Sequence, residues 1–254
     1  MERELIKSAP ADALPRFEAE AAGLAVLRAS GTIRVPEVIA CGVERDQARL
    51  VLEYFDLCGL DRRSGAALGR ALANLHRNLD NQFGAAHDNY IGATPQINAP
   101  NHNWARFFAD CRLTPQLDWA LGNGMDRVLV ARGRDLAERL AAFFVDYAPA
   151  PSLLHGDLWS GNANALADGT PVIFDPAVYY GDREADLAMA ELFGGFPESF
   201  FAAYREAWPL DGGFETRKTL YNLYHILNHF NLFGPSYLGQ AKRMIEKLLG
   251  ELRG

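Results

Sequence analysis

Cysteine is scarce in this sequence, and the few cysteines are far apart. Cys41, Cys58 and Cys111 are the only three in 254 residues. Their number is odd, and no two of them form the C-x-x-C pair that is typical of zinc sites and thiol redox centres. We therefore expect reduced, buried thiols in a cytosolic protein.

Long apolar runs and blocks of basic residues are absent as well. No run reaches the length of a transmembrane helix, and the first residues, MERELIKSAP, lack the apolar stretch of a secretory signal. The formal net charge is −7, and lysine and arginine are not clustered, which argues against nucleic acid as a partner. These features predict a cytoplasmic protein that binds neither membrane nor nucleic acid.

The apolar patterning predicts a small α/β part followed by a larger, mainly helical part. The segment RVPEVIACGV and the run ARLVLEYF read as strands, and the apolar spacing between Phe17 and Leu27 reads as a helix. Helical patterns dominate from about residue 64, while residues 86–103 are rich in Pro, Gly and Asn and read as a loop. The predicted class is α+β, with one lobe over residues 1–55 and a second over residues 56–254.

The segment LLHGDLWSGNANALADGTPVIFDP, residues 153–176, contains the predicted chemistry. Asp168-Gly169 predicts a two-residue turn between antiparallel strands at about 163–167 and 170–174. Such a hairpin brings Asn162 and Asp175 together at its open end. Asp157 lies on the loop that leads into it.

This arrangement suits phosphoryl transfer from ATP. Mg²⁺ prefers a few carboxylate and carbonyl oxygens plus phosphate oxygens, which Asn162 and Asp175 could supply as metal ligands. Asp157 would orient the acceptor hydroxyl or take its proton. The spacing from His155 to Asn162 matches the H-x-D-x-x-x-x-N catalytic loop of protein kinases. A surface hairpin with turn and cap carboxylates is the structural alternative.

Two further elements of a nucleotide site can be read from the first 55 residues. Glu20 lies within the apolar stripe of its helix, where a charge needs a partner, and Lys7 is the candidate. The pair would hold the ATP phosphates. The strand ending in LEYF would form the hinge, with adenine bound by backbone groups near Glu53, Tyr54 and Phe55.

The whole chain from Lys7 onward resembles the fructosamine kinase (ketosamine-3-kinase) family. The resemblance rests on strings such as FEAEAAGLAVLR, DNYIGATPQIN, LLHGDLWSGNA, FDPAVYYGDREADLAM and LYHILNHFNLFGPSY, in that order. It implies a bilobal, protein-kinase-like fold and ATP-dependent phosphorylation of a ketoamine, either a small molecule or a glycated protein amine. Family members carry a glycine-containing hairpin before the lysine strand. Only six residues precede Lys7 here, so we expect a reduced first lobe.

The resemblance also assigns residues on the acceptor side. It implies that Trp159 lines the acceptor site, with core packing as the alternative. His225 and His229 lie four residues apart on an apolar helix, and His225 is predicted to contact substrate or to belong to a buried polar pair. A kinase for another hydroxyl, such as that of an aminoglycoside or amino alcohol, and a weakly active pseudokinase are the competing interpretations.

Overall fold

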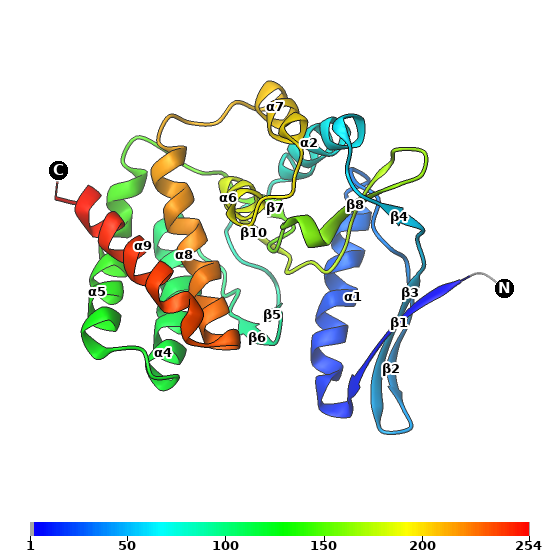
Figure 1. The fold of residues 1–254 in the computed structure, drawn as a ribbon, viewed down its shortest axis with the longest axis horizontal. Helices are drawn as coiled ribbons and strands as arrows, with labels where there is room; N and C mark the ends of the chain where they lie inside the picture. Colours follow the sequence, from blue (N-terminus) through cyan, green and yellow to red (C-terminus); the bar gives the residue numbers. More distant parts are fainter. Residues whose placement is uncertain (1–2, 254) are drawn as a thin grey trace.

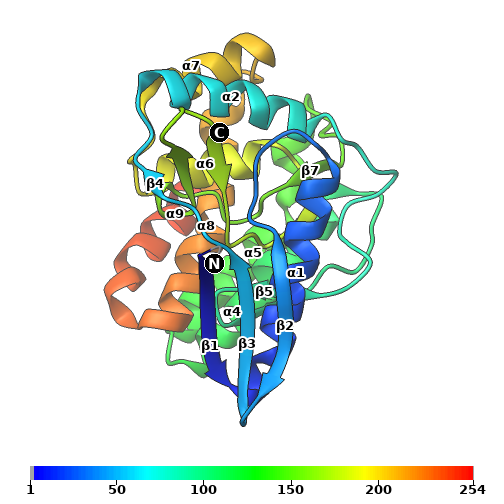
Figure 2. The same ribbon diagram turned by 90° about the vertical axis from the view of Figure 1, so that its right-hand side faces the viewer.

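The computed structural model describes residues 3–253 of the chain. Its first part is a three-stranded antiparallel sheet in the order β1 (Glu4–Pro10), β3 (Gln47–Glu53) and β2 (Val38–Glu44). Helix α1 (Leu14–Ala29) packs against β2 and β3, and Figure 2 shows the sheet with this helix beside it. The helix buries Leu24 and Leu27, as the apolar spacing predicted.

The turn between β2 and β3 was not predicted. Arg45 and Asp46 have φ values of +49° and +64°, the left-handed conformation that a two-residue hairpin turn of type I′ requires at both positions. Glycine and asparagine usually fill these positions, so the sequence Arg-Asp gives no turn signal. The turn makes β2 and β3 a hairpin within the first lobe.

After β3 the chain crosses to the second lobe. Strand β4 (Leu57–Cys58) pairs with β8 (Ala163–Leu166), which in turn pairs with β9 (Pro171–Ile173). The rest is mainly helical, as Figure 1 shows. Its helices are α2 (Arg62–His76), α3 (Trp104–Phe108), α4 (Thr114–Gly122), α5 (Arg127–Glu138), α6 (Glu184–Leu192), α7 (Glu198–Ala207), α8 (Phe214–Phe233) and α9 (Leu238–Glu251).

Short strands complete the second lobe. Strand β7 (Ser152–Leu154) pairs with β10 (Tyr179–Gly181), and β5 (Asn89–Ile91) pairs with β6 (Thr94–Gln96). The second pair is a hairpin inside the segment that the sequence predicted to be a loop. The α+β class is confirmed.

The β8–β9 hairpin differs from its prediction by one residue. Ala163 pairs with Ile173, and the Leu166 N–H donates to the Thr170 carbonyl at 2.9 Å, so the loop has three residues. Gly169 alone takes a positive φ, of +87°, while the Asp168 carboxylate accepts the Thr170 N–H at 2.8 Å. Asp168 thus forms a local side-chain turn that leaves the left-handed position to the glycine, and the predicted two-residue turn is wrong.

The expectation of buried thiols holds for one of the three cysteines. Cys111 is buried, but Cys41 and Cys58 are exposed free thiols, because they lie on β2 and β4, which are both edge strands of their sheets. Within residues 3–253, none of the helices is both long and apolar enough to span a bilayer.

Candidate active site

The loop that carries Asp157 is held by a buried carboxylate on helix α6. Asp186 accepts the backbone N–H groups of His155 at 2.8 Å and Gly156 at 2.9 Å, and it lies 3.2 Å from His76 Nε2. Burial raises the pKa of Asp186, but the hydrogen bond and charge of His76 and the hydrogen bond from the Gly156 N–H outweigh burial and lower the pKa. Asp186 therefore stays ionised and fixes the loop through its main chain.

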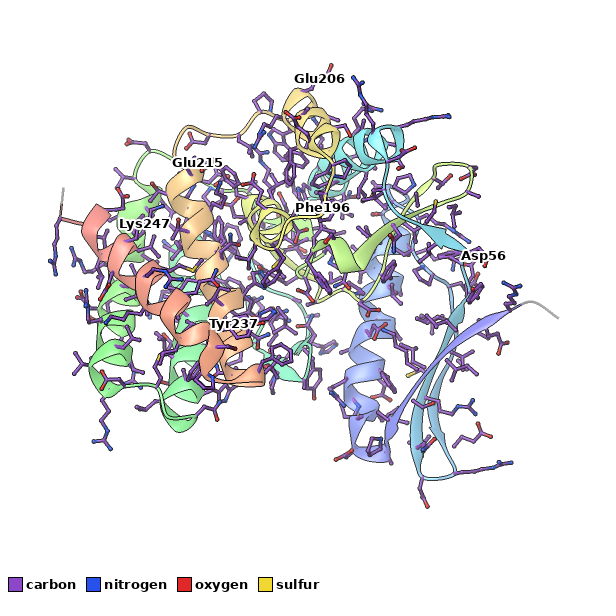
Figure 3. The ribbon with its side chains drawn as sticks, in the orientation of Figure 1. Asp56, Phe196, Glu206, Glu215, Tyr237 and Lys247 are labelled. Atoms are coloured by element: carbon purple, nitrogen blue, oxygen red, sulfur yellow. The ribbon has the colours of Figure 1, made fainter. Side chains whose placement is uncertain are left out.

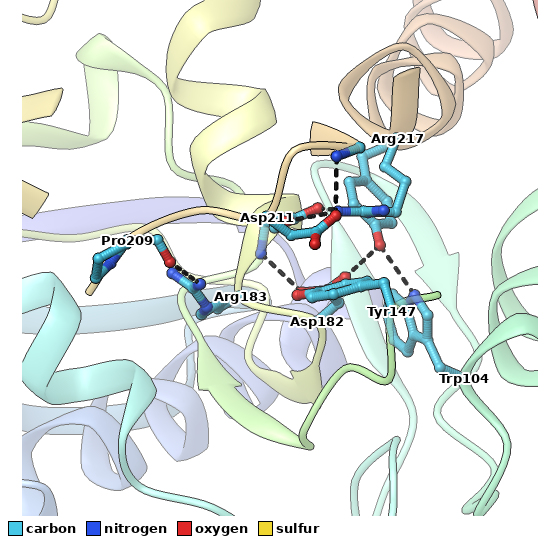
Figure 4. A network of polar contacts seen from close by, with 10 residues as sticks. Trp104, Tyr147, Asp182, Arg183, Pro209, Asp211 and Arg217 are labelled. Carbon is cyan, nitrogen blue, oxygen red and sulfur yellow. Dashed lines mark hydrogen bonds and ion pairs between the residues drawn. The ribbon is translucent and has the colours of Figure 1, made fainter. Parts of the chain in front are cut away.

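A buried network holds the start of α6 in turn (Figure 4). Asp182 accepts hydrogen bonds from the Tyr147 hydroxyl at 2.9 Å and the Tyr221 hydroxyl at 2.5 Å. Two residues on, Glu184 receives a bidentate ion pair from Arg217, with N–O distances of 2.8 and 3.1 Å. Because both carboxylates have partners, the first turn of α6 has one stable position, and Asp186 has one with it.

His155 connects the same loop to the end of β9. Its Nε2 lies 3.0 Å from the Phe174 carbonyl, and its Nδ1 accepts the Asp157 N–H at 3.2 Å. The proton therefore sits on Nε2, since the carbonyl can only accept. Burial lowers the pKa of His155, so the ring is neutral and this arrangement persists at neutral pH.

Asp157 is partly buried beside Asn162, whose amide donates to the Asp157 carbonyl at 2.9 Å and lies 3.4 Å from its carboxylate. Burial, followed by the charges of Asp175 and Asp186, raises the pKa of Asp157 to about 7. A carboxylate with a pKa near neutrality suits a group that accepts a proton from a hydroxyl.

Lys7 reaches across from β1 to this loop. Its Nζ lies 2.7 Å from Glu20 Oε1 and 2.5 Å from Asp175 Oδ1. Burial alone would lower the pKa of Lys7, but the charges of Glu20 and Asp175 prevail and raise it. The predicted partnership between Lys7 and Glu20 is present, and it includes Asp175.

A cleft of about 660 Å³ joins these groups. Of the ten residues predicted for the site, it is lined by six, namely Lys7, Glu20, Asp157, Trp159, Asn162 and Asp175. The cleft also includes Arg16, Phe17, Asn89 and Tyr90, which the sequence did not single out. Arg16 and Phe17 lie on α1, and Asn89 and Tyr90 lie on the β5–β6 hairpin.

The oxygen groups in the cleft fit a divalent metal held together with phosphate. The Asn162 amide nitrogen points at Asp157 and lies 3.5 Å from the Asp175 carbonyl, so its oxygen faces away from both and is available as a ligand. The Asp175 side chain is 46% exposed. Residues 3–253 contain no group of three or more His, Cys, Asp or Glu that could hold a metal by themselves. Two protein oxygens completed by phosphate oxygens are typical of Mg²⁺ in kinases.

A second cavity, of about 350 Å³, adjoins the first and shares Gly92, Asp157 and Trp159 with it. Five of its eleven lining residues carry aromatic rings, namely Trp159, Phe193, His229, Phe233 and Tyr237. Trp159 is 40% exposed, and its ring lies over Gly161, where a Cβ would come within 2.2 Å of the indole. Gly161 therefore lets the indole take this position, and the core-packing alternative for Trp159 is wrong.

His229, one helical turn after His225, lines this second cavity. Its ring centroid lies 5.1 Å from those of Phe193 and Tyr237, and Tyr237 is labelled at the edge of the helical lobe in Figure 3. The Nδ1 atom of His229 lies 2.7 Å from the His225 carbonyl. Nδ1 therefore carries the proton when the ring is neutral, which leaves Nε2 as a hydrogen-bond acceptor.

The structure does not bring His225 to either cavity. His225 is only 4% exposed in α8 and lines neither of them. Burial, and then the charge of His229, lower its pKa to about 3. His225 thus lies in the core as a neutral imidazole, which matches the buried alternative more closely than substrate contact.

The predicted hinge residues lie outside the cleft. The Glu53 N–H is already used by the Glu37 carbonyl at 2.8 Å, because Glu53 still belongs to β3. The main chains of Tyr54 and Phe55 make no backbone hydrogen bond within residues 3–253. The Glu53 N–H is therefore not free for a nucleotide base, whereas the backbone groups of Tyr54 and Phe55 are.

Comparison with known proteins identifies the family of this chain. The family described as fructosamine kinase matches residues 2–251. A probable ketoamine kinase of Vibrio cholerae is 44% identical over 251 residues, which are 98% of this chain and 86% of that protein. The crystal structure of a putative fructosamine-3-kinase from Thermobifida fusca has a TM-score of 0.87 and 34% identity, covering 98% of this chain and 86% of that one.

More distant structures share the fold alone. The choline kinase LicA of Streptococcus pneumoniae has a TM-score of 0.63 at 14% identity, over 98% of this chain and 86% of that one. The fold is therefore that of the bilobal, protein-kinase-like enzymes, and the chain is a phosphotransferase that uses a hydroxyl group as acceptor. By its sequence over almost its full length and by its fold, this chain belongs to the fructosamine kinase family.

Proposed function

We propose that this enzyme transfers the terminal phosphoryl group of ATP to a sugar hydroxyl of a ketoamine, with Asp157 as the group that orients and deprotonates that hydroxyl. The observation that supports this most directly is the position of Asp157, which lines both cavities. One cavity holds Lys7 and the proposed metal ligands, and the other holds several aromatic side chains. A hydroxyl bound in the second would face a phosphoryl group bound in the first, with Asp157 between them.

On the nucleotide side, Asn162 and Asp175 would hold Mg²⁺, which would offset charge on the phosphate oxygens. Lys7, kept in place by Glu20, would contact the phosphates. The contact of Lys7 with Asp175 supports this role, because it puts the ammonium beside the proposed metal ligand. Adenine would bind the main chain near Tyr54 and Phe55, and the boundary between the lobes would fall after Phe55, where the chain passes from β3 to β4.

On the acceptor side, Trp159 would stack on the sugar, and His229 would accept a hydrogen bond from a second hydroxyl. Phe193 and Phe233 are 43% and 63% exposed at this cavity. An open apolar edge leaves room for the amine part of the acceptor, whether a small molecule or a glycated protein side chain. The cytoplasmic location predicted from the sequence suits both kinds of acceptor and stays a prediction.

The test is turnover with ATP and Mg²⁺ on a panel containing a fructosamine, a ribulosamine, an aminoglycoside and choline. We expect phosphorylation of the ketoamines only. The variant Asp157→Asn should lower kcat on the order of 10²–10⁴-fold without unfolding the protein. Asp126→Asn is the matched control, since Asp126 caps helix α5 away from the site and Asn also caps helices well. Turnover confined to choline or the aminoglycoside, or full activity of Asp157→Asn, would contradict the proposal.

A further inference from the structure

The β5–β6 hairpin clamps the main chain that follows Asp175. The Asn89 side-chain amide donates to the Val178 carbonyl at 2.8 Å, and that of Gln96 donates to the Ala177 carbonyl at 3.1 Å. From the opposite side, the Ala177 N–H donates to the His155 carbonyl at 2.9 Å. The peptide two residues after the proposed metal ligand is therefore held by two separate segments of the chain.

Asp175 itself has an unfavourable backbone conformation. Its φ is +56°, in the left-handed region that residues other than glycine seldom occupy. The next residue is Pro176, and a residue before proline prefers extended conformations. Strain of this kind persists only where the surroundings fix the backbone. The clamp on Ala177 and Val178 is such a constraint, applied directly downstream.

The orientation of the clamp follows from the buried guanidinium of Arg112, which can only donate. Its Nη2 donates to Asn98 Oδ1 at 2.8 Å, which leaves the Asn98 amide nitrogen to donate to Asn89 Oδ1 at 2.9 Å. Asn89 must then present its own nitrogen to Val178. A chain of donors thus runs from the guanidinium to a carbonyl, which can only accept, and each bond polarises the next.

Gln96 is fixed in the same way. The Tyr224 hydroxyl donates to Gln96 Oε1 at 2.8 Å, so the Gln96 nitrogen faces Asn89 and Ala177. Gln96 is 1% exposed and Arg112 is 0% exposed. Within residues 3–253 Arg112 forms no ion pair with a carboxylate. It lies instead 4.0 Å from the centre of the Tyr179 ring.

Burying a cation without a counter-ion costs free energy. An apolar side chain could fill the same space without that cost, so packing alone does not account for Arg112. We propose that Asn89 and Gln96 are positioning residues that hold Asp175 in its metal-binding conformation, and that Arg112 sets their orientation. This inference rests on the proposed function, in which Asp175 binds Mg²⁺. Without the clamp, Asp175 relaxes toward an extended backbone and its carboxylate turns away from the metal.

The test measures metal binding apart from turnover. Mn²⁺ is titrated into the protein with a non-hydrolysable ATP analogue, and free Mn²⁺ is followed by electron paramagnetic resonance. For Gln96→Met, which keeps the volume and loses the donor, we expect the Kd for Mn²⁺ to rise about tenfold, as for one lost buried hydrogen bond. The Kd for the nucleotide in EDTA, measured by calorimetry, should stay within about twofold of that of the unsubstituted protein. Asn89→Ala, at a half-buried position, should likewise raise the Kd for Mn²⁺ and leave the Kd for the nucleotide in EDTA nearly unchanged. It replaces Gln96→Met as the test if that variant does not fold.

Ser64→Ala is the matched control, since it removes a partly buried hydrogen bond from the Asp61 N–H at the start of α2. Ser64 lines neither cavity, so this variant should leave Mn²⁺ binding unchanged. Wild-type Mn²⁺ affinity in both hairpin variants would overturn the inference and leave the proposed function intact. Equal weakening of Mn²⁺ binding in Ser64→Ala would show a general loss of stability and would overturn the inference too. If Asp175→Ala binds Mn²⁺ like the unsubstituted protein, the metal assignment in the proposed function fails, and the inference fails with it.

Discussion

His225 should make the fold sensitive to acid. The imidazole is 4% exposed, and its Nδ1 has no hydrogen-bond partner within residues 3–253. Its pKa is about 3, against 6.5 for an unhindered histidine. Below pH 6.5 the unfolded chain binds a proton that the native state refuses, so the free energy of unfolding falls as the pH falls. Each pH unit costs about 1.4 kcal/mol, or about 2 kcal/mol between pH 6.5 and 5.

The assay is urea unfolding at several pH values between 8 and 5, for the unsubstituted protein and for His225→Gln. Burial raises the pKa of Asp157 to about 7, so protonation of that carboxyl group stabilises the fold on acidification. The pH dependence of the free energy of unfolding of either protein alone therefore combines opposite effects. The difference between the two proteins isolates His225. Between pH 6.5 and 5, the free energy of unfolding of the unsubstituted protein should fall by about 2 kcal/mol more than that of His225→Gln. A constant difference would refute the reasoning, and His102→Gln, at an exposed position, controls for loss of an imidazole.

Two further predictions concern the loop and the acceptor cavity. Gly156→Ala should destabilise the protein by at least about 2 kcal/mol in urea unfolding, because Gly156 has a φ of +84° and an added Cβ would lie 2.0 Å from the Ala177 carbonyl oxygen. Gly122→Ala, at a position with open space, is the control and should not destabilise it. A mild effect of Gly156→Ala would show that the loop can shift. Trp159→Ala should raise the KM for the ketoamine on the order of tenfold, equivalent to about 1.4 kcal/mol of lost stacking, with the KM for ATP unchanged; a rise in the KM for ATP instead would put the indole on the nucleotide side.

The sequence predicted the parts of the site that lie close together along the chain. Asn162 and Asp175 are joined by a single hairpin, so their proximity survived the one-residue error in the turn. Glu20 could be paired with Lys7 because helical periodicity placed a carboxylate on a buried stripe, where it required a cation. Both predictions rest on local rules, namely the pairing of adjacent strands in the hairpin and the helical period in the case of Glu20.

The parts that failed depend on tertiary packing. His225 and His229 are four residues apart on one helix face, and only the packing of α8 decides that His229 meets the cavity while His225 is enclosed. The Arg45-Asp46 turn carries no glycine or asparagine to signal its conformation. Side-chain periodicity cannot choose between neighbours on one face, and turn chemistry cannot detect a conformation that the surrounding sheet imposes.

The clamp on Asp175 shows a third kind of limit. Asn89 and Gln96 bind carbonyl groups of the main chain, which every residue possesses, so no residue type at 177 or 178 signals the contact. Asp186 acts in the same way on the N–H groups of His155 and Gly156. Contacts to the main chain leave the side chains of the motif free to face substrate and metal. The residues that hold such a site therefore leave no complementary pattern in the sequence, and they become visible only when the donors and acceptors of the motif's own backbone are traced one by one.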